Sequence, residues 1–183
     1  MSYIQVEDTP NPLAMKFLVE EELLPLGKTF NASSSLQASV SPLASELFQM
    51  EAVSNVFIGS TFVTITKEPF ANWDDLKLEI IEKITYFLRS GLPILNQNSP
   101  AKKEFNSSDP IFAQIEAILD EKIRPSIAQD GGDVIFQGFE DGIVYLELQG
   151  SCSGCPSSTI TLKNGIENLL KYYIPEILMV QQI

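Results

Sequence analysis

The residues best suited to do chemistry are the only two cysteines, Cys152 and Cys155, in the segment Gly150-Ser-Cys-Ser-Gly-Cys-Pro156. Two thiolates at this spacing can bind one soft metal centre, but structural zinc sites and iron–sulfur clusters use four such ligands. The chain has no histidine to supply the other two, and carboxylates are hard ligands that suit iron–sulfide chemistry poorly. A second copy of the loop in a two-fold related chain would complete the set. The sequence therefore predicts a site shared between two chains.

The CxxC spacing by itself leaves other interpretations open. The two cysteines could cycle between a dithiol and a disulfide, form half of a zinc site, or pack as unreactive core residues. Gly150 and Ser151 precede the motif where thioredoxin-like sites usually have an aromatic residue, which weakens the redox interpretation. Without histidine no Ser/His/Asp or Cys/His arrangement can form, and no P-loop or dinucleotide glycine pattern is present. We therefore expect no enzymatic activity.

The elements that must position this loop follow the order α-β-β-α-β. They are a helix starting at Asp109-Pro110, strands at 134–139 and 143–148, a helix at 157–173 and a strand at 177–181. Arg124-Pro125 is expected to end or kink the first helix, because a residue before proline disfavours helix. Asp130-Gly-Gly-Asp133 is interpreted as a structural turn with no ligand role.

The predicted loop thus lies between strand 2 and helix 2 of this half. A helix N-terminus exposes unpaired N–H groups and the positive end of the helix dipole. We therefore expect it to stabilise the thiolates and to donate hydrogen bonds to cluster sulfides.

The first half of the chain predicts a mixed α and β module without a chemical motif. Its expected elements are strands at 4–7, 15–19, 53–58 and 62–66, a helix from Ser41-Pro42 to about Gln49, and a helix capped by Asn72. Residues 93–108 are rich in Asn, Ser, Pro and Lys and predict a flexible linker. The expected architecture is therefore α+β, with domains at 1–92 and 109–183.

Composition narrows the class of protein. The 44% hydrophobic and 20% charged residues are typical of a soluble globular protein. The net charge of −12 argues against a nucleic-acid surface, and no apolar run approaches the ~20 residues of a membrane span. Two cysteines are too few for a disulfide framework, which favours a reducing compartment. The N-terminus does not resemble a leader, so we expect a cytoplasmic protein.

Both halves of the chain contain short motifs of one protein family. In the second half these are Arg124-Pro125, Asp130-Gly-Gly-Asp-Val134, Gly150-x-Cys-x-Gly-Cys-Pro156, Ser158, Thr161-Leu-Lys-x-Gly-Ile-Glu167 and Ile174-Pro-Glu176. In the first half they are Thr9-Pro-Asn-Pro12, Lys16-Phe17, Ser41-Pro-Leu43, Leu47-Phe48, Phe62-Val-Thr-Ile-Thr-Lys67, Trp73 and Leu76-Lys77. With these motifs the chain resembles the NifU-like (Nfu-type) proteins.

The resemblance implies an iron–sulfur cluster scaffold or carrier in which two CxxC loops from two chains hold one [4Fe–4S] cluster. It assigns Cys152 and Cys155 as the cluster ligands. The implied partners are a second copy of the chain, cluster-assembly factors and apo iron–sulfur client proteins, with no nucleic acid and no membrane. The implied location is the bacterial cytoplasm, or the mitochondrial matrix for a mature organellar form.

Overall fold

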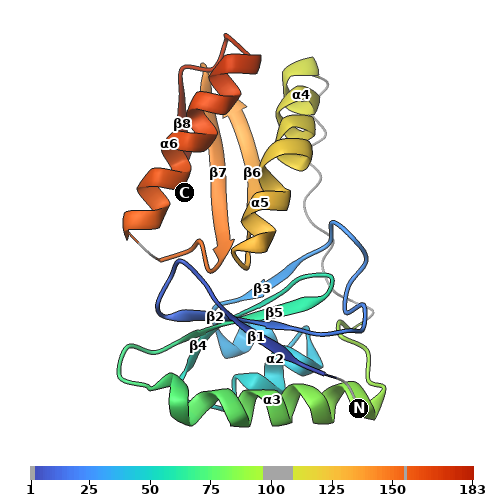
Figure 1. The fold of residues 1–183 in the computed structure, drawn as a ribbon. Helices are drawn as coiled ribbons and strands as arrows, with labels where there is room; N and C mark the ends of the chain where they lie inside the picture. Colours follow the sequence, from blue (N-terminus) through green and yellow to red (C-terminus); the bar gives the residue numbers. More distant parts are fainter. Residues whose placement is uncertain (1–2, 97–108, 155) are drawn as a thin grey trace. The chain divides into compact units, whose positions relative to one another are not determined.

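The computed structural model describes residues 3–96, 109–154 and 156–183. The chain divides into two compact units, Met1–Pro100 and Ala101–Ile183, each with its own sheet and helices (Figure 1). The predicted α+β class is confirmed. Among the described residues, none of the helices combines the length and the apolar character that a membrane span requires.

The first unit contains a five-stranded antiparallel sheet in the order β1-β2-β5-β4-β3. The strands are β1 Gln5–Asp8, β2 Ala14–Leu18, β3 Phe30–Ala32, β4 Val53–Ile58 and β5 Phe62–Lys67. Four were predicted, and β4 has the predicted bounds. The edge strand β3 was missed because three residues are too few to show an alternating pattern, and its pairing with β4 is non-local.

Three helices accompany this sheet: α1 Ser35–Ala38, α2 Pro42–Leu47 and α3 Trp73–Ser90. Both predicted N-caps are confirmed, since the Ser41 hydroxyl accepts the Ala44 N–H and the Asn72 side chain accepts the Asp74 N–H. The short helix α1 was not predicted, and α2 ends before Gln49.

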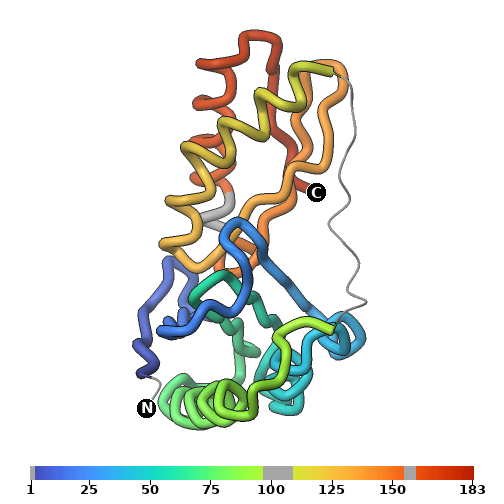
Figure 2. The backbone as a smooth tube through the Cα atoms, turned by 90° about the vertical axis from the view of Figure 1, so that its right-hand side faces the viewer, coloured from blue at the N-terminus to red at the C-terminus, as the bar shows by residue number. Residues whose placement is uncertain are grey.

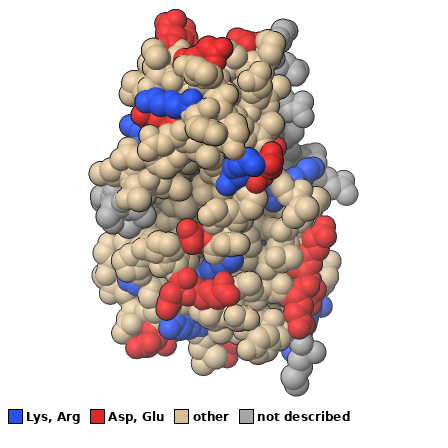
Figure 3. Space-filling model, turned by 45° about the horizontal axis from the view of Figure 1, so that its top comes forward, with Lys and Arg blue, Asp and Glu red and all other residues tan. Residues whose placement is uncertain are grey.

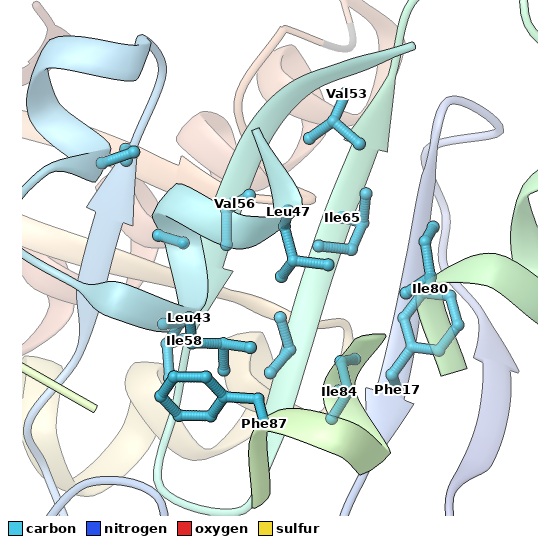
Figure 4. Close-up of a cluster of buried hydrophobic side chains, with 14 of the residues drawn as sticks. Phe17, Leu43, Leu47, Val53, Val56, Ile58, Ile65, Ile80, Ile84 and Phe87 are labelled. Atoms are coloured by element: carbon cyan, nitrogen blue, oxygen red, sulfur yellow. The ribbon is translucent and has the colours of Figure 1, made fainter. Parts of the chain in front are cut away.

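The core of the first unit lies between α2, α3 and one face of the sheet (Figure 4). Its residues from these elements include Phe17, Leu43, Leu47, Val56, Ile58, Ile65, Ile80, Ile84 and Phe87. The buried positions of α3 recur every three or four residues, as the predicted apolar stripe requires.

Residues 93–96, which the sequence assigns to the linker, pack onto the first unit. Ile94 and Leu95 contact its core. The Ser41 hydroxyl donates to the Ile94 carbonyl at 2.6 Å, and the Asn96 N–H donates to the Val40 carbonyl at 2.9 Å. The remainder of the predicted linker, 97–108, lies outside the described residues.

The second unit has the predicted α-β-β-α-β order, with its first helical region in three segments. These are α4 Pro110–Ile118, the five-residue π-helical turn η1 Leu119–Ile123, and α5 Arg124–Gln129. The α-helical hydrogen-bond register therefore breaks just before Arg124-Pro125, but the chain continues as helix for six residues.

The other elements of this unit are β6 Gly132–Glu140, β7 Ile143–Gly150, α6 Pro156–Tyr173 and β8 Met179–Gln182. Strands β6 and β7 form an antiparallel hairpin, and β8 runs parallel to β7 at the sheet edge. Figure 2 shows α4, α5 and α6 on the same side of the hairpin. The core between these layers contains Ile115, Leu119, Val134, Val144, Leu146, Ile166, Leu170 and Val180.

Candidate functional site

The candidate site lies at the end of the β6–β7 hairpin, where the chain leaves the sheet toward α6. Gly132, the first residue of β6, pairs with Gly150, the last residue of β7. Because the strands are antiparallel, this pairing brings the turn before β6 next to the Ser151-Cys152 segment after β7. The sheet register therefore joins the DGGD and CxxC motifs into one structural unit.

Hydrogen bonds fix this junction. The Ser151 N–H donates to the Gly131 carbonyl at 3.1 Å, and the Ser151 hydroxyl donates to the Asp130 carbonyl. The Ser153 N–H and hydroxyl both donate to the Gly150 carbonyl, at 3.1 and 2.9 Å. The backbone amides of Ser151 and Ser153 are thus used within the protein, and the expected hydrogen bonds from the helix N-terminus to cluster sulfides stay a prediction.

Glycine is required at Gly132 by the position of the Cys152 side chain. A Cβ atom on Gly132 would lie 2.6 Å from Cys152 Sγ and 2.7 Å from the Gln149 carbonyl oxygen. Both distances are shorter than any real van der Waals contact of a Cβ. Gly131 is required for a different reason, because its φ of +80° lies in the left-handed region.

Cys152 is buried, with an exposed fraction of 8%. Burial raises the pKa of its thiol to about 11, and the charges of Asp130 and Asp133 act in the same direction, against the hydrogen bond with Ser151. The helix N-terminus was expected to lower the pKa of the thiol, so the expected direction is wrong for Cys152, where desolvation of the charged form is the largest cause.

Cys155, the second predicted ligand, lies outside the described residues. The structure describes the loop up to Gly154, whose φ of +80° turns the chain, and resumes with α6 at Pro156. Among the described residues, no group of three Cys, Asp or Glu side chains is placed to hold a metal ion. Within that part of the chain, Cys152 is thus the only thiol available to a soft metal.

Asp133 has structural contacts at the start of β6, in agreement with the interpretation of the DGGD segment as a structural turn. Its buried carboxylate accepts the Val134 N–H at 2.8 Å and lies 3.6 Å from Arg124 Nε. The same Arg124 Nε donates to the Val134 carbonyl at 3.1 Å, and the guanidinium also pairs with Glu116 and Asp120. Arg124 therefore attaches the start of β6 to the α4–η1–α5 region.

Three supporting residues were not identified from the sequence as part of the site: Gly132, Ser151 and Arg124. A usable signal was present, since a Gly-Gly pair opens one strand of a hairpin whose other strand ends at the cysteine loop. In an antiparallel hairpin, such strand ends lie side by side.

The buried thiol of Cys152 suits a soft-metal ligand better than a redox-active nucleophile. A thiol that is buried and protonated at neutral pH is a poor nucleophile, whereas redox-active cysteines have lowered pKa values. A metal centre can displace the proton and bind the thiolate directly, because metal binding is coupled to ligand deprotonation.

Comparison with known proteins identifies both units. Residues 4–91 match the family model described as the scaffold protein Nfu/NifU N terminal, and residues 115–181 match the NifU-like domain. The chain is 48% identical over 183 residues to the mitochondrial NFU1 iron-sulfur cluster scaffold homolog of Drosophila ananassae, and 45% identical to that of Drosophila willistoni.

These alignments cover 99% of this chain but only 64% and 63% of the two relatives, so the chain spans just under two thirds of their length. A solution structure of a NifU-like protein from Saccharomyces cerevisiae is 29% identical, with a TM-score of 0.46. That match covers 54% of this chain and 87% of the yeast chain. From the two domain matches in this order, the chain belongs to the family of Nfu-type, NifU-like proteins.

Proposed function

We propose that the protein is an iron–sulfur cluster scaffold that binds one [4Fe–4S] cluster between two chains and delivers it to apo target proteins. The observation that carries this proposal is the count of ligands. Each chain has two cysteines and no histidine, while a [4Fe–4S] cluster takes four cysteine thiolates. The names of the relatives, which describe iron-sulfur cluster scaffold homologs, support the same role.

Cys152 and Cys155 are the proposed ligands in each chain. Cys152 is supported by its geometry, since the hairpin end holds its thiol beside Gly132 and Ser151. Cys155 is supported by its spacing alone, because both cysteines of a CxxC loop can bind one cluster. The thiol of Cys152 loses its proton on binding, so cluster loading releases protons.

Delivery rather than storage follows from the shared site. A chain that supplies only two ligands holds its half of the cluster less firmly than a client with a full set of preorganised thiolates. Such a client can exchange the cysteines of one chain and then those of the other. The cluster is thus cargo, and no catalytic step is proposed for the chain.

The proposed partners are a second copy of this chain, cluster-assembly factors and apo iron–sulfur proteins, without nucleic acid or membrane. We propose a reducing compartment as the location. The relatives are named as mitochondrial, which favours the mitochondrial matrix over the bacterial cytoplasm.

Anaerobic reconstitution with iron and sulfide, followed by native mass spectrometry, tests the proposal. We expect about four irons and four sulfides per dimer, with broad visible absorption. Cys152→Ser and Cys155→Ser should each remove both the cluster and the dimer, whereas Ser35→Ala, at an exposed position of the first unit, should retain them. A loaded monomer, a colourless zinc-bridged dimer or reversible disulfide cycling would each contradict the proposal.

A further inference from the structure

Helix α6 has an exposed face without a charged residue. The exposed residues of its described part that share this face are Ile160, Thr161, Asn164, Gly165, Asn168 and Tyr172. Positions three and four apart in a helix are neighbours on its surface, so these residues form one continuous strip. Lys171 and Glu167 flank the strip and pair with each other at 2.6 Å.

This strip differs from an ordinary solvent-facing helix surface. Helix α3 has the same length, and its exposed positions include Asp74, Asp75, Glu79, Glu82 and Arg89. Charged residues of this kind are usual on the side of a helix opposite the core. Both helices also expose large apolar side chains, Leu78 and Tyr86 on α3 and Ile160 at 62% and Tyr172 at 79% on α6. The difference is that the exposed positions in the described part of α6 include no charged residue.

Gly165 lies in the middle of the strip, and its own unit gives no packing reason for a glycine. A Cβ atom built there would meet no heavy atom within 4 Å. Glycine is among the least favourable residues in a helix interior. A second surface that approaches the helix backbone closely would give it a role.

We propose that this strip (Ile160, Thr161, Asn164, Gly165, Asn168 and Tyr172) is the contact surface for a second copy of the chain, with α6 packing against α6 about a two-fold axis. The inference rests on the proposed function. Helix α6 starts at Pro156, immediately after Cys155, so two CxxC loops that share a cluster bring the first turns of two α6 helices close together.

Charge favours a second copy as the occupant. A two-fold contact places the same surface patch on both sides, and like charges that face each other are unfavourable. The chain has 24 acidic and 12 basic residues, and acidic side chains predominate on the face drawn in Figure 3. An uncharged strip is therefore suited to self-association, whereas a basic partner would favour the acidic surfaces.

Opposite charges placed at Asn168 test the contact. We expect Asn168→Glu to raise, by at least about tenfold, the protein concentration at which half of the cluster-loaded dimer dissociates (the dissociation midpoint). The reason is that two copies then place like charges at one surface. Asn168→Lys should do the same alone. An equimolar mixture of the two variants should restore the dimer as a mixed pair. Gln114→Glu, an equal charge change on the exposed side of α4, is the control and should leave the midpoint unchanged.

Sedimentation and native mass spectrometry at low ionic strength, together with iron analysis of each variant, separate the outcomes. Low salt is needed because charges are screened beyond about 8 Å at physiological ionic strength. A wild-type chain that binds no cluster overturns the proposed function and this inference together. If the wild type loads and Asn168→Glu dimerises equally tightly, or the mixture shows no preference for mixed pairs, only the inference is overturned.

Gly165→Ala gives a second test that does not depend on charge. In the apo protein it should raise the melting temperature, because the added methyl group has open space and alanine favours helix. In the loaded protein it should raise the dimer dissociation midpoint, because the methyl group separates the two helices. An unchanged or tighter dimer would contradict the contact at this position.

Discussion

Gly132 and Cys152 lie side by side although most of a β-hairpin separates them in the sequence. The contact leaves no room for even a methyl group between the β6 backbone and the cysteine side chain. A ligand of the proposed cluster is thus held in place by the absence of a side chain on the neighbouring strand.

Gly132→Ala should destabilise the apo protein by about 1–3 kcal/mol, the usual cost of adding volume to a packed site. It should also reduce cluster loading, because the cysteine side chain must move away. Urea unfolding and iron analysis measure the two effects.

A double-mutant cycle with Cys152→Ala isolates the contact with the sulfur. Removing the sulfur should recover part of the stability lost in Gly132→Ala, while the clash with the Gln149 carbonyl remains. Strictly additive effects would show that the two side chains do not interact.

The raised pKa of Cys152 predicts a strong pH dependence of its reactivity. In apo Cys155→Ser, which has one thiol, the alkylation rate should rise about tenfold per pH unit up to about pH 11 rather than level off near the ordinary value of 9.0. Iodoacetamide labelling followed by mass spectrometry measures this rate.

The same pKa predicts how stability changes with pH. A pKa raised in the folded state means that burial of the neutral thiol contributes its full stability below pH 9.0. That contribution is lost as the pH rises toward the folded value of about 11. In the alkylation experiment, a labelling rate that levels off below pH 9 would show that the Cys152 thiol is not buried as described.

We expect Glu167, which contacts the edge strand β8, to make a second pH-dependent contribution to the free energy of unfolding. Its carboxylate accepts hydrogen bonds from the Lys171 ammonium at 2.6 Å and from the Val180 N–H at 2.9 Å. The second bond joins α6 to β8. These hydrogen bonds, that of Lys171 first, lower the pKa of Glu167. Glu167→Gln should reduce the free energy of unfolding at pH 7 by about 1 kcal/mol.

This loss should disappear in acid. A lowered folded pKa gives stability that is present above the ordinary value of 4.5 and is lost as the pH falls below it. Urea titrations at pH 7 and at successively lower pH, to well below the lowered folded pKa of Glu167, compare the variant with wild type. Glu140→Gln at the exposed end of the hairpin is the control. A difference that persists at the lower pH would mean that the charge of Glu167 is not its source.

The two units should fold separately, because each has its own core. A fragment of residues 109–183 should fold and bind cluster, and a fragment of residues 1–96 should fold without binding iron. Residues 1–92 should be less stable than 1–96, because the shorter fragment loses the packing of Ile94 and Leu95 and the hydrogen bonds of Ile94 and Asn96.

Thermal unfolding and iron analysis of the three fragments check this. An unfolded 109–183 fragment, or equal stability of 1–92 and 1–96, would show that the boundaries are drawn incorrectly.

The sequence by itself determined the residues that can do chemistry and the order of the elements around them. The cysteine count, the absence of histidine and the CxxC spacing predicted a shared site without any coordinates. Apolar periodicity and capping residues predicted α3 and the β4–β5 hairpin, because these signals depend on neighbours along the chain.

The tertiary structure alone decided how distant segments meet. The parallel pairing of β8 with β7, the contact of Gly132 with Cys152 and the packing of residues 93–96 each join segments far apart in the sequence. The direction of the Cys152 pKa shift was predicted incorrectly for the same reason. The helix N-terminus is a local feature that the sequence shows, but the burial that raises the pKa arises only when β6, β7 and the loop pack together.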